Sequence, residues 1–191
     1  MKPIAIVVID MLHDFLYGNL KCERALAIIP DLQKLLNFAR EREIPIVYVC
    51  DSHSPEDEEF KKWPPHAIKG TKGAEIIPEL KPKEGDIVIE KTRYSGFYNT
   101  DLDTKLKEFG VKTLILTGIL TDICVQHTAA DAFFRNYKLI VPKETTETLS
   151  QERKEYSLRY MNDIYGAKIL SVNELMKQLR NSTQRGLKFE I

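Results

Sequence analysis

Short apolar runs recur along the chain, and most of the segments between them carry apolar residues at helical spacing. A helix between two strands returns the chain to the same end of a sheet, so strands that alternate with helices pair in parallel. Helices then cover both faces of that sheet. We therefore predict an α/β fold, a three-layer sandwich built on a six-stranded, mostly parallel, doubly wound sheet. The runs are Ile4–Ile9, Ile46–Cys50, Ile87–Glu90, Thr113–Thr117, Lys138–Val141 and Lys168–Leu170.

Residues that start and stop helices lie between these runs. Pro30 suits the first turn of a helix. Ser150 is an acceptable N-cap for a helix that ends at Gly166, and Ser171 and Glu174 have the spacing of a capping box. The predicted helices are 30–39, 104–109, 151–166 and a last helix that opens at 171.

The length and composition suit one soluble domain. The 191 residues are enough for a hydrophobic core, and we expect one domain over residues 1–180 and a tail over 181–191 that either frays or lies against a neighbouring subunit. Lys and Arg number 28, as do Asp and Glu, so a net charge of +0 gives no general attraction for nucleic acid or an anionic membrane. The 3 cysteines do not form a disulfide framework, and neither a signal peptide nor a membrane-spanning run is present. We therefore expect a cytoplasmic protein.

Cys124 lies in the first turn of a further predicted helix, Thr121–Phe134, shortly after the apolar run Thr113–Thr117. Free N–H groups and the positive end of the helix dipole favour a thiolate over a thiol at this position and can hold an oxyanion. We therefore expect a nucleophilic cysteine with a lowered pKa. The alternative is a cysteine that only packs in the core, because free cysteines are among the most buried residues.

Two charged residues lie at the ends of other predicted strands. Asp10 ends the first apolar run and Lys91 follows the third, and open parallel sheets bind ligands at the carboxyl ends of their strands. An ammonium group there would hold Asp10 in place and favour the Cys124 thiolate, while Asp10 carries protons. The alternatives are an Asp10 that caps a loop and a Lys91 on the solvated surface. His127, one turn after Cys124, offers a Cys–His pair, which is less favoured because Asp10 and Lys91 already explain the activation.

A candidate metal site follows the second run. Asp51 and His53 flank one residue, and His66 returns from a loop stiffened by Pro64 and Pro65. A loop of this length in a compact domain is usually functional. The three side chains can converge on one ion, and mixed carboxylate and imidazole ligands suit Zn²⁺, Fe²⁺ or Mn²⁺.

The chain resembles the isochorismatase-like cysteine hydrolases, because it carries an Asp, a Lys and a Cys in this order and the Cys lies inside the segment GILTDICV. The resemblance runs from about Ile4 to Ser171. Within that superfamily the chain is most similar to the nicotinamidase/pyrazinamidase family. It shares with them DSH at Asp51–His53, WPPHAIKGTKGAE at Trp63–Glu75 and KTRYSGFYNTDLD at Lys91–Asp103.

This resemblance implies the roles of the catalytic residues. Cys124 is the nucleophile, Asp10 the proton carrier and Lys91 the positive charge beside them. The resemblance also implies a cis peptide bond between Ile119 and Leu120. The oxyanion donors that we expect are the backbone N–H groups of Leu120 and Cys124.

The resemblance further implies that Asp51, His53 and His66 are metal ligands, with Glu59 in the place of a fourth ligand that some members use. For Glu59 the alternative is a solvated surface, because it belongs to the acidic run 56–59. In such enzymes the metal binds the pyridine nitrogen and orients the carboxamide toward the cysteine. We expect one divalent ion, with zinc favoured over iron and manganese, and no nucleotide or flavin.

Four apolar and aromatic residues match positions that surround the flat ring in the family, although each also suits an ordinary core position. By contrast, Cys22 and Cys50 are expected to be passive, since alternation along the strand points Cys50 away from Asp51. The four candidate substrate-binding residues are Phe15, Leu20, Trp63 and Tyr94.

The resemblance therefore implies a nicotinamidase that converts nicotinamide and water to nicotinate and ammonia, and we expect pyrazinamide to be a side substrate. The alternative within the superfamily is a hydrolase of another small amide or carbamoyl compound. A vinyl-ether hydrolase is less favoured, because the cysteine and the metal ligands would then serve no purpose. Other classes of protein that fit are a catalytically silent binding protein and a metallohydrolase in which metal-bound water attacks. The expected partners are the small-molecule substrate and further copies of this chain in a homo-oligomer, with no nucleic acid and no membrane.

Overall fold

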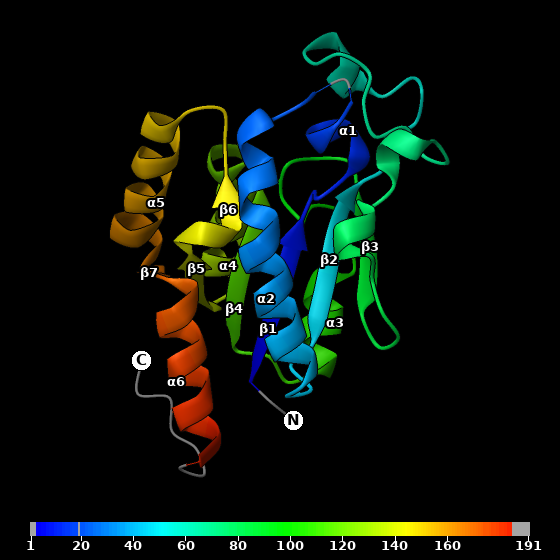
Figure 1. Ribbon diagram of the computed structural model, residues 1–191. Coiled ribbons are helices and arrows are strands. Elements are labelled where there is room, and N and C mark those ends of the chain that lie inside the picture. The colour runs from blue at the N-terminus through cyan, green and yellow to red at the C-terminus, as the bar shows by residue number, and fades with distance from the viewer. Residues whose placement is uncertain (1–2, 19, 185–191) are drawn as a thin grey trace.

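The computed structural model, which describes residues 3–18 and 20–184, confirms the predicted α/β sandwich (Figure 1). The strands that match the predicted runs are β1 (Ile4–Ile9), β2 (Ile46–Asp51), β3 (Ile87–Lys91), β4 (Thr113–Ile119), β5 (Lys138–Pro142) and β7 (Lys168–Leu170). They pair in parallel in the order β3-β2-β1-β4-β5-β7, so β1 lies near the centre of the sheet. A seventh strand, β6 (Thr146–Glu147), pairs with β4 and was not predicted, because two polar residues form no apolar run.

Helices cover both faces of the sheet, and alternate residues of each strand separate two cores. The α-helices are α1 (His13–Leu16), α2 (Ile29–Arg40), α3 (Leu102–Glu108), α4 (Gln126–Phe134), α5 (Gln151–Tyr165) and α6 (Val172–Gln184). On β1, Ile6 and Val8 belong to the core beneath α2 and α6, which lie in front of the sheet in Figure 1. Val7 and Ile9 belong to the core beneath α3, α4 and α5. Period-two alternation thus buries both faces of the central strand.

The predicted helix signals are present at both ends of α5 and at the start of α6. The Ser150 hydroxyl accepts a hydrogen bond from the N–H of Arg153 at 3.2 Å, and Gly166 ends α5 with a left-handed φ of 65°. The Glu174 carboxylate accepts from the N–H of Ser171 at 2.8 Å, while the Ser171 hydroxyl accepts from the N–H of Glu174 at 3.2 Å. These reciprocal bonds confirm the capping box.

Some element boundaries differ from the sequence predictions. Helix α3 begins at Leu102 rather than Thr104, and α6 continues to Gln184, so the predicted tail 181–191 begins as helix. Residues 185–191 of that tail lie outside the described residues. The segment between β2 and β3 is mostly irregular, as predicted. Short 3-10 turns occur at Glu23–Ile28, Glu58–Lys61, Lys72–Ala74, Pro78–Leu80 and Lys143–Thr145.

The carboxyl ends of the strands meet at the upper edge of the sheet in Figure 1, next to the long segment between β2 and β3. Strands β2, β1 and β4 are neighbours, and β3 pairs with β2. Residues at the ends of these four strands therefore lie close together. Within the described residues, no helix is long and apolar enough to cross a membrane.

Gly118 allows β1 and β4 to approach closely just below this edge. Its φ is +98°, and a Cβ added there would lie 2.0 Å from the carbonyl oxygen of Ile9.

We expect Gly118→Ala to lower the free energy of unfolding by about 2 kcal/mol or more beyond the cost of the left-handed backbone alone. Gly85→Ala is the matched control, because Gly85 has a φ of +89° but, beyond its chain neighbours, no atom of the described residues lies within 4 Å of the added Cβ. Equal losses for both variants in denaturant titrations would contradict this account.

Candidate active site

The side chain of Lys91 lies at the centre of a buried cluster of charged and nucleophilic groups. Its Nζ lies 2.7 Å from Oδ2 of Asp10, donates to Oδ1 of Asp51 and donates to Sγ of Cys124 at 3.7 Å. Asp51 and Lys91 are register partners at the ends of β2 and β3, and Asp10 follows β1. The four residues are 8% exposed or less. The structure thus brings Asp10, Lys91 and Cys124 together and adds Asp51 to them.

The two carboxylates keep Lys91 charged. Burial alone would lower the pKa of Lys91, but Asp10 and Asp51 outweigh it and raise this pKa well above its usual value. Burial also acts to raise the pKa of Asp51, yet Lys91 and His53 hold it below its usual value. For Asp10, burial and the charge of Asp51 prevail over Lys91 and raise the pKa to about 6. Asp10 is therefore the carboxyl group of this cluster that binds a proton most readily.

The pKa of the Cys124 thiol differs from the sequence prediction. Burial raises this pKa well above its usual value; Lys91 lowers it, but Asp10 and Asp51 raise it further. The helix terminus and the single ammonium group therefore do not produce a resting thiolate. The expectation of a lowered pKa was wrong because the sequence did not reveal that the sulfur is buried beside two carboxylates. A base must take the thiol proton when the sulfur attacks.

Cys124 lies in a π-helical turn, Thr121–Val125, that links β4 to α4. The peptide bond between Ile119 and Leu120 is cis, as the resemblance implied. The carbonyl of Leu120 accepts hydrogen bonds from the N–H groups of Ile123 and Val125, both at 3.1 Å. The N–H of Cys124, which lies between these two donors in the chain, is not bonded to that carbonyl. It belongs to the helix start, where backbone N–H groups are available to a ligand.

Polar contacts anchor this turn to β6 and α5. The hydroxyl groups of Thr121 and Thr146 lie 2.8 Å apart, and the Ser157 hydroxyl donates to the carbonyl oxygen of Thr121 at 3.1 Å. Asp122 accepts hydrogen bonds from Thr148 and Arg153. The turn that carries the candidate nucleophile is therefore bonded both to the region of β6 and to α5.

Asp51, His53 and His66 form a buried group whose candidate ligand atoms all lie within 4.8 Å of one another. Oδ2 of Asp51 lies 3.6 Å from Nε2 of His53 and 3.9 Å from Nε2 of His66. Nε2 of His53 is buried and has no hydrogen-bond partner among the residues that the structure describes. An unpaired buried nitrogen facing a carboxylate and a second imidazole fits a divalent cation. The predicted set of three is thus brought together.

The other nitrogen of each imidazole is held by a group that the sequence analysis did not identify. Nδ1 of His53 lies 3.1 Å from Oδ2 of Asp57, and Nδ1 of His66 lies 2.8 Å from the carbonyl oxygen of Pro64. Such contacts orient a ligating histidine and leave Nε2 free for a metal. Burial lowers the pKa of His66, which favours the neutral ring that binds metals. Asp57 was hidden in the acidic run 56–59, and only its spacing of four residues from His53 hints at this contact.

Glu59 lines the same cavity, but its carboxylate is not within 4.8 Å of all three candidate ligands. One of its oxygens lies 3.9 Å from Nη1 of Arg93. Burial and the charge of Asp51 raise the pKa of Glu59. Its role as a fourth ligand stays a prediction, and Asp57 rather than Glu59 contacts His53.

Asp14 is a second residue that the sequence analysis missed. Its Oδ2 accepts a hydrogen bond from the N–H of Ala67 at 2.9 Å, next to His66 in the chain. A Cβ at Gly73 would lie 2.1 Å from the same oxygen, so a side chain at residue 73 would displace the Asp14 carboxylate from its present position. Asp14 thereby ties the loop that carries His66 to α1. The segments are far apart in the sequence, and no local pattern reveals the contact.

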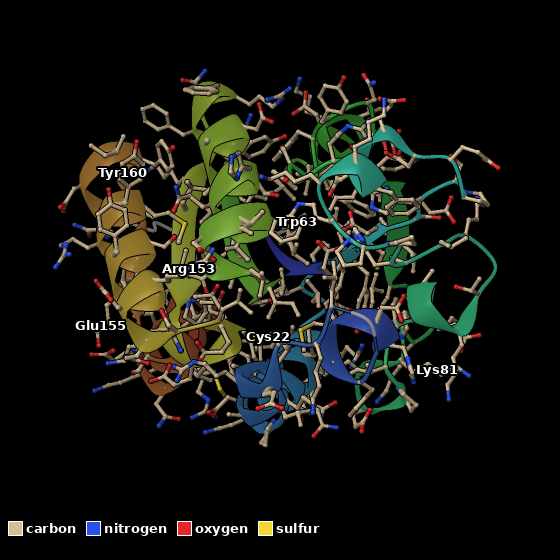
Figure 2. All side chains as sticks on the ribbon, turned by 90° about the horizontal axis from the view of Figure 1, so that it is seen from above. Cys22, Trp63, Lys81, Arg153, Glu155 and Tyr160 are labelled. Atoms are coloured by element: carbon tan, nitrogen blue, oxygen red, sulfur yellow. The ribbon has the colours of Figure 1, made fainter. Side chains whose placement is uncertain are left out.

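A cavity of about 230 Å³ opens beside both groups of residues. Its size suits a small ligand, since pockets for drug-sized molecules are larger. The indole N–H of Trp63 donates to the hydroxyl of Tyr94 at 2.9 Å, and the rings of Phe15 and His66 lie 5.4 Å apart. Figure 2 looks down on the sheet edge and places Trp63 near the middle of the molecule. The lining comprises Asp10, Phe15, Leu20, Lys21, Asp51, Glu59, Trp63, His66, Tyr94, Ile119, Leu120, Ile123, Cys124 and Leu149, which includes all four candidate substrate-binding residues.

The remaining histidine and cysteine candidates lie outside the cavity lining. His127 is exposed, and its Nδ1 lies 2.7 Å from the carbonyl oxygen of Ile123. Cys22 and Cys50 are buried in the core beneath α2, whereas Cys124 belongs to the opposite core. The structure therefore supplies no contact between His127 and Cys124 among the residues it describes, and Cys50 points away from Asp51 as expected.

Solved structures similar to this chain include three amidases or nicotinamidases. N-carbamoylsarcosine amidase from Thermoplasma acidophilum is 39% identical with a TM-score of 0.84, over 90% of this chain and 98% of that one. Nicotinamidase/pyrazinamidase PncA from Bacillus subtilis is 33% identical with a TM-score of 0.85, over 89% and 100%. The pyrazinamidase of Pyrococcus horikoshii in complex with zinc is 29% identical with a TM-score of 0.84, over 89% and 99%.

The isochorismatase domain model matches residues 4–174. This span contains the whole cavity lining and every element of the sheet. Members of the family are amidohydrolases and cysteine hydrolases. The chain therefore belongs to the isochorismatase family of hydrolases.

Proposed function

We propose that this protein is a nicotinamidase, which hydrolyses nicotinamide to nicotinate and ammonia through a thioester on Cys124. One observation carries the proposal: the buried cluster around Lys91 and the Asp51–His53–His66 group meet at one small cavity. Nicotinamide has a carboxamide for the first group and a ring nitrogen for the second. Aromatic walls from Trp63 and Tyr94 suit a flat ring.

The first half of the reaction forms a thioester and releases ammonia. A carboxylate oxygen of Asp10 lies within 4.8 Å of Sγ of Cys124, so Asp10 takes the thiol proton as the sulfur attacks the amide carbon. The N–H groups of Leu120 and Cys124 stabilise the oxyanion that forms. The C–N bond then breaks, and Asp10 returns its proton to the departing nitrogen. Lys91 remains protonated throughout and holds Asp10 in position.

The second half of the reaction regenerates the thiol. Water enters the space that ammonia leaves, and Asp10 takes one of its protons as the oxygen attacks the thioester carbon. The same N–H groups hold the second oxyanion. The C–S bond breaks and the Cys124 sulfur regains a proton from Asp10. The product leaves as nicotinic acid, which releases its proton to solvent and becomes nicotinate. Over both halves, the reaction consumes one water molecule and needs no other reactant.

Asp51, His53 and His66 would hold the divalent ion. When bound, the ion supplies a Lewis-acidic anchor for the ring nitrogen. Asp57 and the Pro64 carbonyl orient the two imidazoles for that purpose. Zinc is the favoured ion, since a similar pyrazinamidase is in complex with zinc.

A second candidate substrate is an N-carbamoyl amino acid. Lys21 lines the cavity, and its side chain is 42% exposed and lies 3.4 Å from Glu23. Its ammonium group would attract the carboxylate that such a substrate carries and nicotinamide lacks. An N-carbamoylsarcosine amidase is also among the similar structures.

We expect Cys124→Ala to abolish ammonia release from nicotinamide while nicotinamide binding, measured by calorimetry, persists, because the nucleophile and the ring anchor are separate. Asp10→Asn should lower kcat by about 10²–10⁴-fold, since it removes the proton carrier without changing shape. Cys50→Ala is the matched control, because Cys50 is also buried but lies in the other core. Turnover by Cys124→Ala would favour attack by metal-bound water instead.

We expect nicotinamide and pyrazinamide to be hydrolysed with kcat/KM at least roughly 100-fold above that of benzamide, which lacks the ring nitrogen. Removal of the metal should lower kcat/KM for nicotinamide toward that for benzamide, and it should leave kcat/KM for benzamide nearly unchanged. Ammonia release from all three amides and from N-carbamoylsarcosine, before and after chelation, checks this. If kcat/KM is higher for N-carbamoylsarcosine than for nicotinamide, and Lys21→Met lowers the N-carbamoylsarcosine value, the substrate is the second candidate rather than nicotinamide.

We expect Asp57→Ala to weaken zinc binding by about 10–100-fold, because the His53 ring loses the group that orients it. Zinc titration by calorimetry measures this without reference to activity. Glu58→Ala is the matched control, since Glu58 belongs to the same acidic run but is exposed and pairs with Lys61. Unchanged zinc affinity in Asp57→Ala would remove Asp57 from the metal site.

A further inference from the structure

Arg93 lies on the segment that follows β3, two residues after Lys91. It is not among the residues that line the active-site cavity. Its Nη1 donates a hydrogen bond to the carbonyl oxygen of Thr92. Its segment is also bonded to α4, because the Ser95 hydroxyl donates to Oδ2 of Asp131 at 2.5 Å. Arg93 therefore extends from a part of the sheet edge that is held in place.

The guanidinium group of Arg93 pairs with Asp57, which belongs to the long segment between β2 and β3. Nη1 of Arg93 donates to Oδ1 of Asp57 at 3.0 Å and to Oδ2 at 3.3 Å. The side chain of Asp57 is 9% exposed, whereas that of Arg93 is 41% exposed. Water and salt screen a partly buried pair less than a pair between two exposed side chains. This contact therefore constrains Asp57 more than an ordinary surface ion pair would.

Each oxygen of Asp57 has a second contact. Oδ2 lies 3.1 Å from Nδ1 of His53, and Oδ1 accepts a hydrogen bond from the N–H of Glu59 at 2.9 Å. His53 and Glu59 belong to the same long segment as Asp57. Within the described residues, Arg93 is the one side chain from outside that segment that donates a hydrogen bond to this carboxylate. The contacts from Arg93 through Asp57 to His53 thus tie the sheet edge to one imidazole of the proposed metal site.

We propose that Arg93 is a positioning residue of the metal site and acts through Asp57, by fixing the carboxylate that orients the His53 ring. This inference rests on the metal site of the proposed function. Charge alone predicts the opposite effect, because a cation near a bound divalent ion repels it. Removal of Arg93 therefore weakens metal binding if Arg93 positions Asp57, and strengthens metal binding if Arg93 acts only by its charge. The sign of the change separates the two accounts.

The test measures zinc affinity by calorimetry in Arg93→Met, which removes the charge and keeps an unbranched stem. We expect the dissociation constant to rise about 3–10-fold, less than in Asp57→Ala, because Arg93 acts one residue further from the ion. In the Asp57→Ala background, Arg93→Met should cause no further rise, since the residue through which it acts is gone. Lys69→Met is the matched control, because Lys69 pairs with Glu90 in an exposed ion pair and should leave zinc affinity unchanged.

A second measurement follows the His53 ring itself in the zinc-loaded protein. When Nε2 binds zinc, Nδ1 of the same ring carries a proton, and a hydrogen bond protects that proton from exchange with water. Nuclear magnetic resonance of protein labelled with ¹⁵N at histidine measures this exchange. Arg93→Met should speed the exchange at His53 and leave the exchange at His66 unchanged, because Nδ1 of His66 is held by the carbonyl oxygen of Pro64 instead.

Unchanged or tighter zinc binding by Arg93→Met would overturn the proposal. An equal loss of zinc affinity in the natural and the Asp57→Ala backgrounds, or exchange at His53 as slow as in the natural chain, would overturn it as well. A natural chain that binds no zinc would overturn both this inference and the proposed metal site. The zinc measurements need no substrate, so they decide the role of Arg93 even if the chain does not hydrolyse nicotinamide.

Discussion

The buried ammonium group of Lys91 is the interaction on which the active-site geometry depends. An unpaired charge in this position would cost several kcal/mol, so Lys91 requires the carboxylates of Asp10 and Asp51. Those partners come from the ends of two neighbouring strands. The Cys124 sulfur contacts the ammonium group from the turn that follows a third strand. The position of one charge therefore sets how the ends of four strands meet. It also determines which carboxyl group is left with a raised pKa and can move protons.

The site divides its work between the sheet edge and the long segment after β2. The sheet edge holds the reacting groups, whereas the segment supplies His66 and the aromatic wall at Trp63. Asp51 belongs to both parts, because it contacts Lys91 on one side and faces the two imidazoles on the other. The proposed metal site and the proposed nucleophile site thus share one carboxylate. The hydrogen bond from the Ala67 N–H to Asp14 ties the segment to α1.

The strands and the helix caps could be predicted because their causes are local. Apolar runs mark the strands, and Ser150, Gly166 and the Ser171–Glu174 pair mark helix ends by their own backbone chemistry. The catalytic and metal candidates could be placed because strand ends converge in a parallel sheet. Strand β6, the Asp57 contact and the fit of Gly73 against Asp14 depend on segments that meet only after folding. The thiol pKa was misjudged for the same reason, since the burial of Cys124 beside two carboxylates is a tertiary property.

The central claim is that Cys124 attacks the substrate and carries the acyl group. Intact-protein mass spectrometry of the enzyme, quenched in acid at a series of times during nicotinamide turnover, tests this most directly. The account predicts a species heavier by one nicotinoyl group, with the modification on the peptide that contains Cys124. Accumulation of nicotinate with no adduct across the whole series, or an adduct on another residue, would contradict it.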